Sequence, residues 1–308
     1  MCSYQQYSGS LRAAKAARVK GEYMKTVMVL GAGTMGSGIA QVCAASGYKV
    51  YFWDLTKALA ESGKNRIGDG LSRQVERRKM TCDTREKILD NIVPTTDLSL
   101  AAEAKLVMEV VVEDIKIKKD LYSRVEPFCK VKTVIGTNTS FIPISKLAED
   151  LEHPERFVGI HFFVPVYAMK LVEVIRGEKT NTATMNAAAD FARSLGKETV
   201  TVNNDAPGFI VNRINMATYA EAIKVLQEGV ATVEDIDKAL KLGLNYPMGP
   251  FELMDYGGLA TMQACFKTLY ELTGDERFKP VPEIDAKVEA GDLGRKTGKG
   301  FYDYDKAK

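Results

Sequence analysis

The chain has 308 residues, of which 45% are hydrophobic and 27% charged, and its formal net charge is +2 at pH 7. This length accommodates two domains, and the small net charge gives no reason to expect nucleic acid as a partner. No apolar run approaches the roughly 18 residues of a membrane span, so no membrane partner is expected. The five cysteines are scattered and form no C-x-x-C pair, which indicates a reducing compartment, and the two histidines exclude a three-histidine metal site.

Residues 1–23 differ from the rest of the chain. They carry basic residues but no acid before Glu22, and they lack the apolar core of a secretory signal. One interpretation is a transit peptide. The other, which we favour, is a translated leader before a start at Met24, because Lys-Gly-Glu-Tyr-Met can be encoded with a purine-rich GGAG upstream. We therefore expect a leader or disordered extension at 1–23 and a bacterial cytoplasmic protein, with the mitochondrial matrix as the alternative.

Residues 26–30 predict a buried strand, and the stretch 31–36 that follows it has the spacing G-x-G-x-x-G. In this motif the first glycine permits a tight turn, the second lets the backbone approach a pyrophosphate, and the third lets helix and strand pack closely. The start of the following helix offers free N–H groups to the phosphates. The predicted cofactor contacts in this stretch are Gly31, Gly33, Thr34, Met35 and Gly36.

A second predicted strand, 49–53, ends at Asp54, which lies 18 positions after Gly36. The motif places a carboxylate at about this distance to bind the adenine-ribose 2′-hydroxyl. Because an ionised carboxylate would repel a 2′-phosphate, the sequence favours NAD over NADP.

Strands and helices continue to alternate up to residue 206. A charged helical pair is predicted over 56–91, and its basic residues indicate either a solvated surface or an arm that meets a phosphorylated ligand. Strands are predicted at 106–112, which only Glu109 interrupts, and then at 133–137, 157–163, 171–175 and 199–202. Helices are predicted between them, at 115–128, 143–151 and 183–195.

Beyond residue 207 the pattern is helical, with segments at 209–228, 233–242 and 251–290. The fold class predicted is α/β, with a doubly wound Rossmann-type sheet in an NAD-binding domain at 24–206. An all-helical domain for substrate binding and dimerisation follows at 207–308. Its glycine-rich basic tail, 294–302, predicts a backbone fold-back near anions.

Three polar residues that could take part in a reaction lie at or near the ends of two predicted strands. Asn138 and Ser140 follow one strand and His161 belongs to the next, so all three are expected where open α/β sheets bind their ligands. Histidine is suited to proton transfer near neutral pH. Glu173 lies in an apolar strand, where a carboxylate needs a partner, and an imidazole is the best candidate. The alternative is a half-exposed glutamate and an unrelated core histidine.

These motifs together resemble the short-chain L-3-hydroxyacyl-CoA dehydrogenase family, and within it the bacterial members that act on 3-hydroxybutyryl-CoA. The resemblance extends from about Met24 to Tyr304. It rests on the glycine-rich stretch and on six further blocks: Asn138-Thr139-Ser140, His161-Phe162-Phe163, Lys170–Val174, Pro207–Arg213, Pro247–Pro250 and Gly294–Tyr302.

The family implies reversible oxidation of an (S)-3-hydroxyacyl-CoA, such as 3-hydroxybutyryl-CoA, to the 3-ketoacyl-CoA, such as acetoacetyl-CoA, in a homodimer. His161 would exchange the hydroxyl proton, and Glu173 would hold its ring. Ser140 and Asn212 would position the substrate. The family further implies NAD contacts from Glu113, Lys118, Asn138 and Lys296, and contacts to the CoA phosphates from Arg73 and Arg77.

The chain departs from the family pattern at three positions. Val164 replaces an asparagine expected near the nicotinamide, Phe141 stands where a second serine is frequent, and Gly70 replaces a serine on the CoA-facing helix. Two other functions remain open: a related hydroxy-acid dehydrogenase and a non-enzymatic NAD-binding protein. The Tyr-x-x-x-Lys signature of another dehydrogenase class occurs only at the extreme C-terminus. Butyrate-type fermentation and fatty-acid oxidation are equally compatible contexts.

Overall fold

The computed structural model describes residues 26–305, so the expected leader at 1–23 lies outside the described residues. The chain divides into two compact units between Asp205 and Ala206. Within residues 26–305, no helix combines the length and apolar character that crossing a membrane requires.

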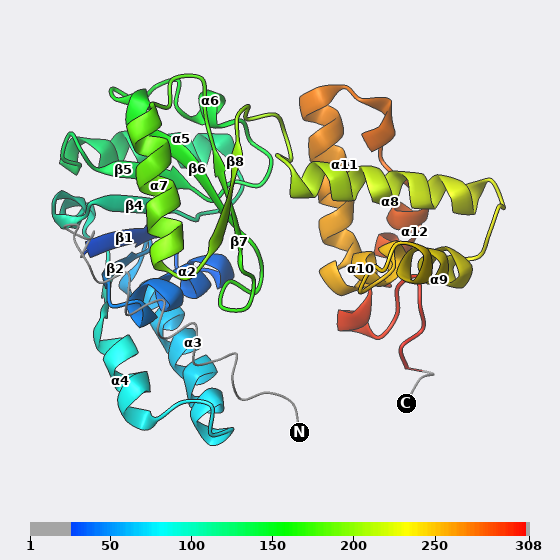
Figure 1. The fold of residues 1–308 in the computed structure, drawn as a ribbon, viewed down its shortest axis with the longest axis horizontal. Coiled ribbons are helices and arrows are strands. Elements are labelled where there is room, and N and C mark those ends of the chain that lie inside the picture. Colours follow the sequence, from blue (N-terminus) through cyan, green and yellow to red (C-terminus); the bar gives the residue numbers. More distant parts are fainter. Residues whose placement is uncertain (1–25, 306–308) are drawn as a thin grey trace. The chain divides into compact units, whose positions relative to one another are not determined.

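The first unit is built on one eight-stranded sheet (Figure 1). Its strands are β1 (Thr26–Leu30), β2 (Lys49–Trp53), β3 (Ile92–Thr95), β4 (Leu106–Glu109), β5 (Val134–Thr137), β6 (Phe157–Phe162), β7 (Leu171–Ile175) and β8 (Glu198–Val202). Their order is β3-β2-β1-β4-β5-β6-β7-β8, and every pair is parallel except β6 with β7. The chain therefore runs outward from β1 in both directions, as in a doubly wound sheet, and the order reverses between β1 and β4.

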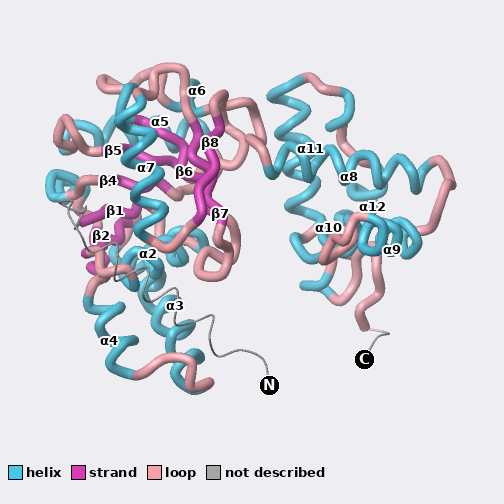
Figure 2. The backbone as a smooth tube through the Cα atoms, viewed as in Figure 1, coloured by secondary structure: helices cyan, strands magenta, loops and turns pink. Residues whose placement is uncertain are grey.

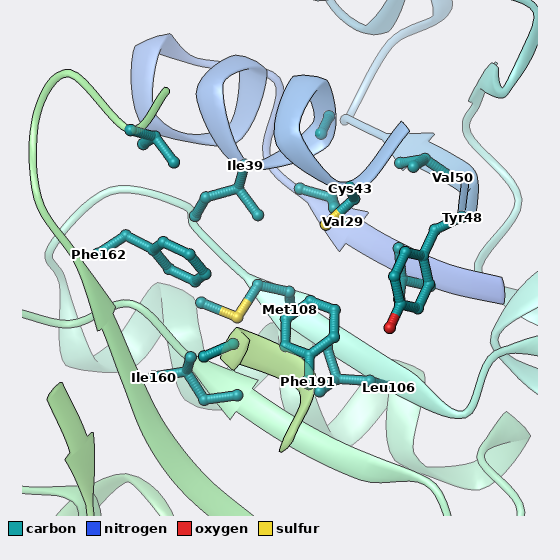
Figure 3. Packing of buried hydrophobic residues seen from close by; sticks show 14 of the residues in the cluster. Val29, Ile39, Cys43, Tyr48, Val50, Leu106, Met108, Ile160, Phe162 and Phe191 are labelled. Atoms are coloured by element: carbon teal, nitrogen blue, oxygen red, sulfur yellow. The ribbon is translucent and has the colours of Figure 1, made fainter. Parts of the chain in front are cut away.

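Six α-helices connect the strands: α2 (Thr34–Ala45), α3 (Lys57–Glu76), α4 (Cys82–Asp90), α5 (Ile115–Val125), α6 (Ile144–Leu147) and α7 (Thr182–Ser194). Alternate residues of β1 enter two different cores because side chains along a strand alternate between faces. Val27 and Val29 belong to the core that α2 and α7 cover, shown in Figure 3 with Ile39, Cys43 and Phe191. Met28 and Leu30 belong to the core on the other face, with Leu121 and Val125 of α5.

Two strands differ from the sequence prediction. β4 ends at Glu109 instead of continuing to residue 112, because the Glu109 side chain itself accepts a hydrogen bond from the Val111 amide, 2.7 Å away. β3 was not predicted. It is a short outer strand beside β2 that contains Pro94, which fits an edge position because proline cannot donate to the ladder.

The second unit is helical, as predicted, and Figure 2 shows strands only in the first unit of the described chain. Its α-helices are α8 (Val211–Gln227), α9 (Val233–Gly243), α10 (Pro250–Gly257), α11 (Leu259–Thr273) and α12 (Pro282–Glu289). The C-terminal tail folds back on α10, where the Phe301 and Tyr302 amides donate to the buried carboxylate of Asp255 at 2.9 and 3.0 Å. Within this unit, the folded-back tail therefore contacts the Asp255 carboxylate as its anion.

Candidate active site

The glycine-rich turn after β1 has the geometry of a phosphate-binding loop. Gly31 has a φ of +109°, and a Cβ built on it would lie 2.8 Å from the Val110 carbonyl oxygen. A Cβ on Gly36 would lie 1.8 Å from the Gly31 oxygen, so close packing excludes side chains at both positions. A Cβ on Gly33, in contrast, would meet no atom of the described chain within 4 Å. Open space at Gly33, directly before α2, is what a bound pyrophosphate requires.

Asp54 is fixed against this turn. One carboxylate oxygen accepts from the Ala32 amide at 2.7 Å and the other from the Leu55 amide at 2.7 Å. The side chain is half-buried at the carboxyl end of β2, where a ribose next to the pyrophosphate can reach it. The residues present therefore fit a dinucleotide.

The basic residues of the predicted phosphate-binding arm separate into two groups. Arg66 donates to the Ala32 carbonyl oxygen at 2.9 Å and to Ser37 Oγ at 3.0 Å, so it holds the glycine-rich turn. Arg73 and Arg77 are exposed at the end of α3, available to a ligand. On the same helix, a Cβ on Gly70 would meet no described atom within 4 Å, so a serine would fit there.

His161 and Glu173 form a buried pair. They face each other directly in the antiparallel β6–β7 register, and His161 Nδ1 lies 2.8 Å from Glu173 Oε2. The side chains are only 5% and 0% exposed. His161 Nε2 lies 3.1 Å from Ser140 Oγ. With Nδ1–H donating to the carboxylate, Nε2 of a neutral ring is left as a hydrogen-bond acceptor and possible base.

Glu113 holds the loop that carries Ser140. Its Oε1 accepts from Thr139 Oγ1 at 2.5 Å and from the amides of Ser140 at 2.9 Å and Phe141 at 3.2 Å. Burial raises the pKa of Glu113, but the Lys118 ammonium and these three donors outweigh it and keep that pKa below its usual value. Glu113 thus stays ionised and ties the segment after β4 to the segment after β5.

Two predicted cofactor residues have extensive protein contacts in the first unit. Asn138 Oδ1 accepts from the Phe162 amide at 2.9 Å, which links the ends of β5 and β6. Lys118 is 1% exposed, and its ammonium lies 2.8 Å from Glu109 and 3.3 Å from Glu113. Their direct contacts with NAD remain predictions.

Asn212 and Lys296 belong to the second unit, and their roles also remain predictions. Asn212 is half-buried in the first turn of α8, and Lys296 is exposed in the short 3-10 turn Arg295–Thr297.

Of the positions that depart from the family pattern, Val164 is 63% exposed and Phe141 is buried. Val164 is thus accessible to a ligand, whereas Phe141 is part of the packed interior.

Within residues 26–305, no cluster of three or more histidine, cysteine or acidic side chains could hold a metal ion.

The sequence prediction did not include Glu109 and Thr139 among the site residues. The signal for Glu109 was present, since it is the single charged residue of an otherwise apolar strand. Thr139 lies in the block Asn138-Thr139-Ser140, but the sequence analysis assigned it no role.

Comparison with known proteins gives matches along nearly the whole chain. The family description "3-hydroxyacyl-CoA dehydrogenase, NAD binding domain" matches residues 26–206, and "3-hydroxyacyl-CoA dehydrogenase, C-terminal domain" matches 208–304. A 3-hydroxybutyryl-CoA dehydrogenase of Bradyrhizobium diazoefficiens is 44% identical over 285 residues, covering 92% of this chain and 97% of that protein. The mitochondrial hydroxyacyl-coenzyme A dehydrogenase of Sus scrofa is 40% identical, with 96% of each chain covered.

A solved structure agrees with these matches. The (S)-3-hydroxybutyryl-CoA dehydrogenase of Ralstonia eutropha superposes with a TM-score of 0.85 at 39% identity, covering 91% of this chain and 99% of that one. The resemblance inferred from the motifs is confirmed, and the chain belongs to the 3-hydroxyacyl-CoA dehydrogenase family.

Proposed function

We propose that this protein interconverts (S)-3-hydroxybutyryl-CoA, or another short-chain (S)-3-hydroxyacyl-CoA, and the corresponding 3-ketoacyl-CoA with NAD. The observation that carries the proposal is the buried His161–Glu173 pair with Ser140 beside it, in an NAD-binding domain of this family. The names of the relatives support the substrate class.

In the oxidation direction His161 Nε2 accepts the proton of the substrate's C3 hydroxyl. Ser140 Oγ, 3.1 Å from Nε2, donates to the same substrate oxygen and keeps it in line with the ring. Glu173 holds the tautomer and stabilises the imidazolium that forms. When bound, NAD⁺ supplies the acceptor for the hydride that leaves C3, so that a carbonyl forms. In reduction, His161 returns the proton.

The remaining residues have supporting roles in this proposal. Gly31, Gly33, Thr34, Met35 and Gly36 bind the pyrophosphate, and Asp54 binds the adenine ribose. Further NAD contacts come from Glu113, Lys118, Asn138 and Lys296. Arg73 and Arg77 bind CoA phosphates, and Asn212 helps to position the acyl group. Loss of Arg77 should raise KM for acetoacetyl-CoA more than KM for acetoacetyl-pantetheine, which lacks those phosphates.

We also propose that the helical unit, 207–308, forms a homodimer, which sedimentation of the purified protein tests. The bacterial relatives support a bacterial cytoplasmic location, and the mitochondrial relatives keep the matrix as the alternative. N-terminal sequencing of the native protein decides whether 1–23 is retained.

The experiment that tests the reaction follows NADH oxidation with acetoacetyl-CoA. His161→Ala should reduce kcat at least ~100-fold, since general acid–base catalysis contributes that much. His153→Ala is the matched control, because it removes the other histidine, whose side chain is 37% exposed beside Glu155. Turnover of free hydroxy acids instead of CoA esters would favour a related dehydrogenase, and NADH binding without turnover would favour a non-enzymatic protein.

A further inference from the structure

Glu109, the last residue of β4, is a buried carboxylate with four hydrogen-bond donors. It is 0% exposed. Its Oε1 accepts from the Val111 amide at 2.7 Å and from Lys118 Nζ at 2.8 Å. Its Oε2 accepts from Tyr122 Oη at 2.5 Å and from Thr137 Oγ1 at 2.7 Å. A buried charge is costly unless it is paired in this way, so its presence in an apolar strand requires a reason.

One of these donors leads to the active site. Lys118 Nζ lies between two carboxylates, 2.8 Å from Glu109 and 3.3 Å from Glu113. Glu113 in turn accepts from the Ser140 amide, and Ser140 Oγ lies 3.1 Å from His161 Nε2. A continuous series of contacts therefore connects the end of β4 to the reacting imidazole.

The charges along this series favour a fixed geometry. Two carboxylates share one ammonium, and Lys118 is 1% exposed, so water offers it little alternative solvation. The contact with Glu109 fixes the position of the ammonium, and the ammonium fixes Glu113. If Glu109 were neutral, Lys118 could move toward Glu113, and Glu113 could release the amides and hydroxyl of residues 139–141.

We propose that Glu109 is a positioning residue for catalysis, which holds Ser140 and His161 in register through Lys118 and Glu113. This proposal rests on the proposed function, because it assigns Glu109 a part in that reaction. It differs from a role in folding alone. Such a role would make the Tyr122 and Thr137 contacts as important as the Lys118 contact, whereas positioning makes only the Lys118 contact matter for turnover.

The test uses Glu109→Gln in the full chain, with Tyr122→Phe as the matched control. Tyr122→Phe removes one donor from the same carboxylate but leaves Lys118 and Glu113 in place. Glu109→Gln should lower kcat roughly 10- to 100-fold, since small misplacements near reacting groups cost that much. Tyr122→Phe should stay within about threefold of wild type even if its Tm falls. Should Glu109→Gln fail to fold, Lys118→Met tests the same connection, and its kcat at saturating NADH, where weaker cofactor binding has no effect, should fall by the same factor.

A double-mutant cycle examines whether Glu109 acts through Glu113. The variant with both Glu109→Gln and Glu113→Gln should have a kcat within about twofold of Glu113→Gln alone, because residues in one network are not additive. A multiplicative loss would overturn the proposal, as would a Glu109→Gln variant that retains kcat within about twofold of wild type.

A second readout does not depend on turnover. The chain has two histidines, so their Hε1 NMR resonances are readily assigned. Glu109→Gln should shift the His161 resonance and leave that of His153 in place. The control Glu126→Gln should do the reverse, because Glu126 accepts from the His153 amide at 3.1 Å. An inactive wild-type enzyme would refute the proposed function alone, whereas an unmoved His161 resonance would refute the positioning role.

Discussion

Replacing Glu173 with glutamine removes a charge next to the imidazole while retaining the side-chain shape. The amide oxygen can still accept from His161 Nδ1–H, so the ring keeps a partner at the present 2.8 Å. The carboxylate is 0% exposed, and the lost interaction is therefore poorly replaced by water. Unit charges about 4 Å apart, the approximate separation of the two charge centres, interact by about 4 kcal/mol at an effective dielectric constant of about 20.

The transition state carries only part of the imidazolium charge. If about half has developed, Glu173→Gln loses about 2 kcal/mol, and kcat should fall about 30-fold. The KM values should change little, because the ground-state ring is neutral in the oxidation direction.

Steady-state kinetics in both directions measures this effect. Glu126→Gln is the control, because Glu126 is also a buried carboxylate in an ion pair, with Arg156 at 3.2 Å, and has no contact with His161 among those described. A Glu173→Gln enzyme with kcat reduced less than about threefold would refute the role given to this pair.

Five other substitutions test the remaining features of the site. Gly33→Ala should leave Tm nearly unchanged, because its Cβ meets no described atom within 4 Å, but calorimetry should show NADH binding weakened at least about tenfold. Gly36→Ala, whose Cβ would lie 1.8 Å from the Gly31 oxygen, should instead lower Tm strongly. Val164→Asn should lower the Kd for NADH about 2- to 10-fold by fluorescence titration, the effect of one hydrogen bond, and an unchanged Kd would show that valine costs nothing. Gly70→Ser should lower KM for acetoacetyl-CoA but leave KM for NADH unaltered. The pKa of Glu113 is lowered from 4.5, so the ionised side chain should stabilise the fold fully above that pH. This contribution to the free energy of unfolding should be lost as the pH falls through the folded-state pKa, and Glu113→Gln should flatten that part of a plot of unfolding free energy against pH.

The sequence was sufficient where local patterns decide structure. The strand, glycine-rich turn and helix at 26–45 follow from apolar periodicity and from glycine spacing, and the structure has them at these positions. The contact of His161 with Glu173 was anticipated by a cost argument, since a carboxylate in an apolar strand requires a partner. Ser140 was expected shortly after a strand, and it follows β5 in the structure.

The sequence was insufficient where contacts join distant elements. Glu109 receives donors from β5, from α5 and from its own turn, and no spacing along the chain shows that these meet. The short strand Ile92–Thr95 was missed because it contains proline and lacks an apolar run. The basic residues of 56–91 were interpreted as either a solvated surface or a ligand-binding arm. The Arg66 guanidinium instead holds the glycine-rich turn, and only the fold brings α3 to that turn.

The direction of β7 explains how an acid so close in sequence to His161 can support its ring. A parallel successor to β6 would need a crossover of a dozen or more residues, usually a helix, before the acid could appear. The antiparallel turn instead places Glu173 directly opposite His161 after 12 positions. A slip of one residue would move the carboxylate to the other face of the sheet. Pairing of β7 with β8 on its other side, where Glu173 lies opposite Val200, opposes such a slip. Two strand registers therefore hold the Glu173 carboxylate opposite His161.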